Sequence, residues 1–161
     1  VKVSMDKLLK LLDTNARLSN AQLAAMLDTT EADVAEQIAA LERSGVVRAY
    51  KALIDWDRTD REYVTAVIEL RVTPKRDLGF EGIAETVMRF DEVESVYLMS
   101  GGYDLLVIVN GRTFKEVAMF VAKRLSLLDS VLSTATHFVL RRYKDSGVMF
   151  LAEEKDERGA L

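Results

Sequence analysis

The chain has 161 residues, of which 49% are hydrophobic and 30% are charged, and its formal net charge is −4. This composition is typical of one large or two small globular domains, without an apolar run of membrane length. The absence of cysteine and the single histidine, His137, argue against disulfides, a metal site and a histidine-relay enzyme. The lack of cysteine suits a reducing cytoplasm, and we expect a cytoplasmic protein with no metal site and no membrane partner.

Residues 5–45 are predicted to form three short helices, because leucines and other apolar residues recur there at helical spacing. Asn15 is expected to end the first helix in a left-handed conformation. Ser19 and Gln22 form a capping box that opens the second helix. Thr30 is the predicted N-cap of the third helix, and Gly45 follows its end. Two short helices across a tight turn, preceded by a third, predict a helix-turn-helix domain over residues 1–55.

The next segment, residues 46–54, is rich in β-forming residues and is predicted to be extended. Residues 56–62 are polar apart from Trp56, and we interpret them as a linker. A second domain is predicted over residues 63–145. The remainder, residues 146–161, is expected to be a tail that contains a charge run at 153–158.

The second domain alternates strands and helices in the order βαββαβ. The predicted strands are 64–72, two runs within 93–109, and 133–143; the predicted helices are 80–90 and 114–128. This order is that of the ferredoxin-like α+β fold, an antiparallel sheet with two helices on one face. Since the strands appear apolar on both sides, we expect the sheet to pack against a second copy of the chain.

The sequence Ser-Gly-Gly-Tyr-Asp at residues 100–104 interrupts the two central strands. Glycine adopts positive φ without strain, so a tight turn is predicted there. Such a turn presents backbone amides, a phenol and a carboxylate, and it can hold a small polar molecule such as an amino acid. An ordinary hairpin, with Asp104 bonded to backbone amides, is the alternative.

Taken together, these features resemble the leucine-responsive/asparagine regulator (Lrp/AsnC) family over residues 5 to about 145. The resemblance rests on four segments in this order: MDKLLKLLDTNARLSNAQLA, ALERSGVVRAYKALID, YLMSGGYDLLVIV and STATHFVL. It implies a transcription regulator that binds double-stranded DNA and has no catalytic site and no cofactor. It also implies an amino acid or related metabolite as effector, and a homodimer that assembles to tetramers or octamers.

The resemblance places the effector between subunits, near the Gly-rich turn and the start of the last strand. Transferred to this sequence, the effector-binding candidates are Ser100, Gly101, Gly102, Tyr103, Asp104, Thr134 and Thr136. Asp104 is suited to pair with an α-ammonium group, and glycine amides and threonine hydroxyls are suited to hold a carboxylate. The DNA-contact candidates around the third helix are Thr29, Thr30, Glu31, Asp33, Gln37, Arg48, Tyr50 and Lys51.

The third helix is unusually acidic for a DNA-reading element, and this leaves two other hypotheses open. Carboxylates are repelled by phosphates and read few base edges. One alternative is a metabolite-binding module whose helix-turn-helix contacts protein instead of DNA. The other is an enzyme resembling siroheme decarboxylases, which the lack of a histidine near the SGGYD turn disfavours.

Overall fold

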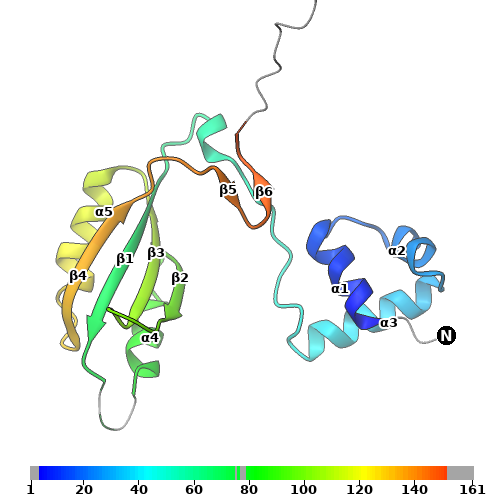
Figure 1. Cartoon of the computed structure of the whole chain (residues 1–161), viewed down its shortest axis with the longest axis horizontal. Coiled ribbons are helices and arrows are strands. Elements are labelled where there is room, and N and C mark those ends of the chain that lie inside the picture. Colours follow the sequence, from blue (N-terminus) through cyan, green and yellow to red (C-terminus); the bar gives the residue numbers. More distant parts are fainter. Residues whose placement is uncertain (1–3, 75, 77–78, 152–161) are drawn as a thin grey trace, which may run out of the picture. The chain divides into compact units, whose positions relative to one another are not determined.

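The computed structural model describes residues 4–74, 76 and 79–151 and divides the chain into two compact units, Val1–Ile54 and Asp55–Leu161 (Figure 1). Each unit has a hydrophobic core of its own. The predicted charge run at 153–158 lies outside the described residues.

The first unit consists of the three predicted helices, α1 (Met5–Thr14), α2 (Asn20–Leu27) and α3 (Glu31–Arg43). Their apolar faces meet in one core. The buried residues of this core are Leu8, Leu12, Leu23, Ala24, Val34 and Leu41. The helical periodicity of the sequence therefore identified both the elements and the faces that they bury.

Local signals at the helix ends behave as predicted, with one exception. Ser19 and Gln22 form the reciprocal capping box of α2. Gly45 has φ +74° just after α3, and the backbone N–H of Val46 donates to the carbonyl of Leu41, which completes a Schellman-type stop. The prediction for Asn15 is wrong, because its backbone is extended at φ −151° instead of left-handed.

The last segment of the first unit contains no strand. Residues 46–54 lie outside any strand of the described chain. A strand needs a neighbour that supplies its ladder hydrogen bonds, and the described residues offer none to this segment. The prediction of an extended, β-rich segment thus identified its composition but not a regular element.

The second unit has the predicted βαββαβ order and forms one four-stranded antiparallel sheet with the strand order β2-β3-β1-β4. Figure 1 shows β1 between β3 and β4. The elements are the short 3₁₀ turn η1 (Trp56–Arg58), β1 (Val64–Val72), α4 (Glu81–Val87), β2 (Val93–Leu98), β3 (Leu105–Gly111), α5 (Phe114–Phe120), the π-helical turn η2 (Val121–Leu125) and β4 (Val131–Phe138). The ferredoxin-like prediction is confirmed.

The two faces of this sheet differ in chemistry. Ala66, Ile68 and Leu70 of β1 are fully buried in the core that α4 and α5 contribute to. Because side chains alternate along a strand, the residues between them lie on the opposite face. That uncovered face is apolar in its middle, at Val67 and Ile108, which are directly paired. The expectation of an apolar outer face therefore holds only in part, since β1 carries Glu69 and Arg71 towards its end.

Several element ends differ from the prediction. The helix predicted to reach Phe90 ends at Val87, and the helix predicted over 114–128 continues past Phe120 only as the π-helical turn. The last strand runs over 131–138 instead of 133–143. It ends where β1 begins, since the N–H of Val139 still donates to the carbonyl of Thr65 but no partner residue of β1 extends beyond.

A small hairpin follows the sheet, where the sequence predicted the end of a strand and the start of a tail. β5 (Lys144–Asp145) pairs with β6 (Val148–Met149) across Ser146 and Gly147. Both turn residues have positive φ, at 47° and 81°. This is the two-residue turn that matches the twist of antiparallel strands. The predicted tail boundary at residue 145 falls inside this hairpin.

Candidate functional sites

The start of α3 is held by two threonine hydroxyls. Thr30 is the N-cap and accepts a hydrogen bond from the N–H of Asp33, as predicted. The hydroxyl of Thr29 donates to Asp33 Oδ2 at 3.0 Å. Hydrogen bonding of the Asp33 carboxyl to the Thr30 side chain, and then to the Thr29 hydroxyl, lowers the pKa of that carboxyl. Three of the DNA-contact candidates therefore also fix the geometry of the turn between α2 and α3.

The outer surface of α3 is acidic. Glu31, Glu36, Glu42 and Arg43 are all exposed, and the candidate Gln37 is half-buried. Glu31 occupies the first turn, where a carboxylate is favoured by the helix dipole. The exposed surface of α3 is thus formed by short side chains and carboxylates, with a single guanidinium at its far end.

Basic candidates follow α3 along the chain. Arg48 and Lys51 are exposed. The hydroxyl of Tyr50 donates to Glu42 Oε1 at 2.9 Å, and burial together with this carboxylate raises the pKa of the Tyr50 phenol. Tyr50 is therefore neutral and tied to α3, whereas Arg48 and Lys51 present their charges to solvent.

The Ser100–Asp104 turn links β2 to β3, as predicted, and is fastened to β1 by polar contacts. Gly101 has φ +115°, a conformation that side-chain-bearing residues rarely adopt. The Nε of Arg71 donates to the carbonyl of Gly102 at 2.9 Å. Asp104 Oδ2 accepts from the N–H of Val72 at 2.8 Å, and the N–H of Asp104 donates to the carbonyl of Leu70. The Asp104 carboxylate thus bonds a backbone amide, the alternative role that its residue type suggested.

A cleft of about 230 Å³ lies beside this turn. Its size is below that of a drug-sized site and suits a small metabolite. The lining comes from β1, the turn and β4, and consists of Glu69, Arg71, Gly102, Tyr103, Ser133, Thr134 and Ala135.

The cleft unites three of the seven effector candidates, Gly102, Tyr103 and Thr134. Ser100, Gly101 and Asp104 belong to the same turn but do not line it. Thr134 and Thr136 are paired with Leu70 and Ile68 in the register, so the side chains of both lie on the helix-covered face of the sheet, and of the two only Thr134 lines the cleft. The structure does not bring Thr136 to the cleft.

Four lining residues were not predicted: Glu69, Arg71, Ser133 and Ala135. The register pairs Glu69 with Ala135 and Arg71 with Ser133, so all four lie on the uncovered face. A signal for them was present in the sequence. Glu69 and Arg71 interrupt the odd-numbered positions of a strand whose even-numbered positions are entirely apolar. The missing information was the pairing of β1 with β4, which are far apart in the sequence.

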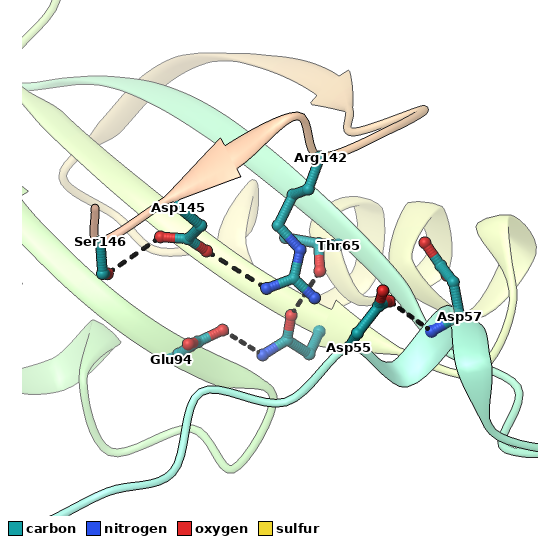
Figure 2. A network of polar contacts seen from close by, with 8 residues as sticks. Asp55, Asp57, Thr65, Glu94, Arg142, Asp145 and Ser146 are labelled. Carbon is teal, nitrogen blue, oxygen red and sulfur yellow. Dashed lines mark hydrogen bonds and ion pairs between the residues drawn. The ribbon is translucent and has the colours of Figure 1, made fainter. Parts of the chain in front are cut away.

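A polar network occupies part of the second unit away from the cleft (Figure 2). Thr65 donates to the side-chain carbonyl of Asn110, whose amide group donates to Glu94. Close to them, Arg142 pairs with Asp145 at 3.2 Å. The described residues hold no cluster of three or more His, Cys, Asp or Glu side chains arranged for a metal ion. We interpret the network as a structural support for the end of the sheet.

Two protein families match the two units of the chain. Residues 7–48 match the winged helix-turn-helix DNA-binding family, and residues 65–149 match the Lrp/AsnC ligand binding domain. These matches define the class: a helix-turn-helix transcription regulator with a ligand-binding domain, not an enzyme. Because the ligand-binding match spans more than half of the chain, the chain belongs to the Lrp/AsnC family.

Individual relatives agree with this assignment. An uncharacterised HTH-type transcriptional regulator of Bacillus subtilis (strain 168), YugG, is 46% identical over 94% of this chain and 92% of its own. The leucine-responsive regulatory protein of Haemophilus influenzae is 26% identical over 90% of this chain and 87% of its own. A transcriptional regulator from Neisseria meningitidis, solved in complex with L-Met, has a TM-score of 0.73 at 26% identity, with 88% of this chain and 90% of that chain covered. No helix among the described residues is long and apolar enough to span a membrane.

Proposed function

We propose that this regulator binds an amino acid in the cleft beside residues 100–104 and that the bound amino acid changes how the protein assembles on DNA. The observation that carries this proposal is the cleft itself. It is small and lined by both a carboxylate and a guanidinium, and it opens on the uncovered face of the sheet. The L-Met complex of the N. meningitidis relative supports an amino acid as the ligand class.

The uncovered sheet face is the proposed surface for homodimer formation. Val67, Leu106 and Ile108 form an apolar centre on it, and each is half-buried within the single chain. Packing a second copy on this face removes apolar surface from water, which is the main favourable term in association. Further assembly to tetramers or octamers is part of the same proposal. The cytoplasm is the compartment in which a DNA-binding regulator of this kind acts.

DNA contact is proposed for the start of α3 and for the basic segment after it. The backbone amides near Thr29 and Thr30 and the side chains of Arg48 and Lys51 are suited to phosphates. Glu31, Asp33 and Gln37 face the groove in this proposal, and Tyr50 holds the basic segment against α3. Since phosphate contacts are few per subunit, affinity depends on how many subunits engage the operator together.

The test is a fluorescence-anisotropy titration of the full chain with DNA from upstream of its own gene, over a salt series and with each amino acid in turn. We expect saturable binding that weakens with salt and shifts with at least one amino acid. The double variant Arg48→Glu/Lys51→Glu is expected to abolish binding, while Lys7→Glu/Lys10→Glu on α1 serves as a charge-matched control.

Two results would contradict the proposal. Absence of DNA binding by the folded, assembled protein at low salt favours a protein partner for the acidic α3. If the protein binds DNA and no amino acid changes that binding, then an amino acid bound in the cleft does not regulate DNA binding.

A further inference from the structure

We infer that Glu69 and Arg71 are the residues that recognise the two charges of a zwitterionic effector, with Glu69 holding its ammonium group and Arg71 holding its carboxylate. This inference rests on the proposed function and deepens it. It replaces Asp104 and the threonine hydroxyls, to which residue type alone assigns these roles.

The first argument is that the side chains of Asp104, Thr134 and Thr136 are positioned elsewhere. The Asp104 carboxylate accepts the Val72 amide across the turn, and Asp104 does not line the cleft. The side chains of Thr134 and Thr136 lie on the other face of the sheet, because these residues are paired with Leu70 and Ile68. Among the described residues that line the cleft, Glu69 carries the one carboxylate and Arg71 the one guanidinium.

The second argument is that both side chains keep hydrogen-bonding capacity. Arg71 uses Nε for the carbonyl of Gly102, and no bond to a described residue engages its two terminal amino groups. Glu69 Oε2 lies 3.4 Å from His137 Nε2, and Oε1 has no partner among the described residues. The side chain of Glu69 is only 35% exposed, so a charge brought to it is partly shielded from water.

The third argument is spacing. Glu69 and Arg71 are two residues apart on one face of β1, a separation of about 6.7 Å along the strand. An α-amino acid carries its opposite charges on adjacent groups, and a charge-assisted hydrogen bond to each spans about 2.8 Å. One zwitterion therefore fits between the two side chains. Ser133 and Ala135, which are paired with Arg71 and Glu69 on β4, are small and leave room for the rest of the ligand.

The pair also defines what the cleft excludes. A simple carboxylic acid leaves Glu69 without its cation and brings a second anion close to it. An amino-acid amide leaves the guanidinium of Arg71 without its anion. Because each mismatch leaves a charge unpaired, the cleft discriminates by charge pattern as well as by shape.

The experiment is calorimetric titration of the full chain with each of the twenty L-amino acids. It is then repeated, for every amino acid that binds, with its primary amide and with the carboxylic acid that lacks the amino group. We expect the wild-type protein to bind each analogue about tenfold or more weakly than the parent amino acid.

The variants assign each charge to its residue. In Glu69→Gln the discrimination against the acid without the amino group is expected to fall to within about threefold, while discrimination against the amide persists. In Arg71→Gln the discrimination against the amide is expected to fall to within about threefold, while discrimination against the acid without the amino group persists. Arg71→Lys, which keeps the charge but loses the fork that reaches Gly102, is expected to retain discrimination against the amide. If Arg71 has only a structural role, its substitution weakens binding of the amino acid, the amide and the acid without the amino group by the same factor. The ratio of each analogue's affinity to that of the parent amino acid then stays unchanged.

Glu85→Gln and Arg89→Gln, both exposed and outside the cleft, are the matched controls and are expected to behave as wild type. If an amino acid binds but both ratios survive in the Glu69 and Arg71 variants, the assignment of these residues is overturned and the proposed function stands. If none of the twenty binds the folded wild-type protein, the amino-acid effector is overturned together with it.

Discussion

At the scale of single residues, Asp33 shows how a side chain considered for DNA contact also has a folding role. Its carboxylate accepts the Thr29 hydroxyl, and its backbone N–H is capped by Thr30. Hydrogen bonding of the carboxyl to the side chain of Thr30, and then to that of Thr29, favours its ionised form, which is why its pKa lies below the ordinary value of 3.8. Asp33 was chosen as a DNA-contact candidate for its position on α3, yet its carboxylate already accepts a hydrogen bond within the protein in the absence of DNA.

The lowered pKa of Asp33 predicts a pH dependence of stability. A carboxyl whose pKa is lower in the folded state stabilises that state above its unfolded pKa, and the contribution is lost as pH falls through the folded pKa. The difference in melting temperature between wild type and Asp33→Asn is thus expected to be largest near neutral pH and to vanish in acid. Thermal melts from pH 7 to pH 2 measure it. Asp13→Asn, an exposed substitution on α1, is expected to show no such trend, and a difference that persists in acid would contradict the assignment.

Gly101 and Gly102 make a matched pair for testing the strain in the turn. Neither has any atom within 4 Å of an added Cβ, so the space is equal, but only Gly101 has a positive φ, at +115°. We expect Gly101→Ala to lower the free energy of unfolding by about 1–3 kcal/mol through backbone strain. Gly102→Ala is expected to be close to neutral. Urea denaturation of both variants measures the difference, and equal effects would show that φ is not the cause.

At the scale of elements, the sequence predicted best what is determined locally. Ser19, Gln22, Thr30 and Gly45 act within one turn of helix, and all four behave as expected. The end of β4 and the absence of a strand at 46–54 depend on which partner is available, and that information is not local. The hairpin at 144–149 was missed even though Ser146-Gly147 is a favourable two-residue turn, because the strands on either side are only two residues long.

The cleft shows the same division between local and long-range information. The turn at 100–104 was recognised from its glycines, whereas Glu69, Arg71, Ser133 and Ala135 were not. Their proximity depends on the pairing of β1 with β4. Thr134 and Thr136 were both candidates, yet only Thr134 reaches the cleft. The Asp104 carboxylate was a candidate for binding the effector, but in the structure it accepts a hydrogen bond from the backbone N–H of Val72.

Ala135 provides a test of the cleft as a binding site. It lines the cleft, is exposed, and is paired with Glu69. We expect Ala135→Leu to fill the space and to reduce amino-acid binding about tenfold or more, with little effect on stability because the site is at the surface. Calorimetric titration and a thermal melt together measure both. Ala122→Leu, on the exposed surface of η2, is the control; unchanged binding by Ala135→Leu would place the effector elsewhere.

At the scale of the whole molecule, charge and assembly have to be considered together. The net charge is −4, and α3 carries four acidic residues against one arginine. A single subunit with these charges has little electrostatic affinity for DNA. Binding by several linked subunits would offset this weakness, since the second contact would be made at a high effective concentration. Oligomer formation is therefore expected to be a condition for DNA binding.

Ile108→Lys tests this dependence. Ile108 lies at the centre of the uncovered sheet face, directly opposite Val67, and is only half-buried in the single chain. A lysine there is tolerated in a lone subunit but is costly in an apolar interface. We expect sedimentation velocity to show a smaller species and anisotropy to show weaker DNA binding. Ala122→Lys is the control, and an unchanged sedimentation coefficient for Ile108→Lys would move the interface to another surface.

The cleft and the apolar centre of the sheet share one face, and this has a thermodynamic consequence. If subunits pack over that face, effector binding and self-association are linked equilibria, and each must change the other's constant by the same factor. The apparent dissociation constant of the effector will then vary with protein concentration, and the protein's abundance in the cell will set the metabolite level to which it responds.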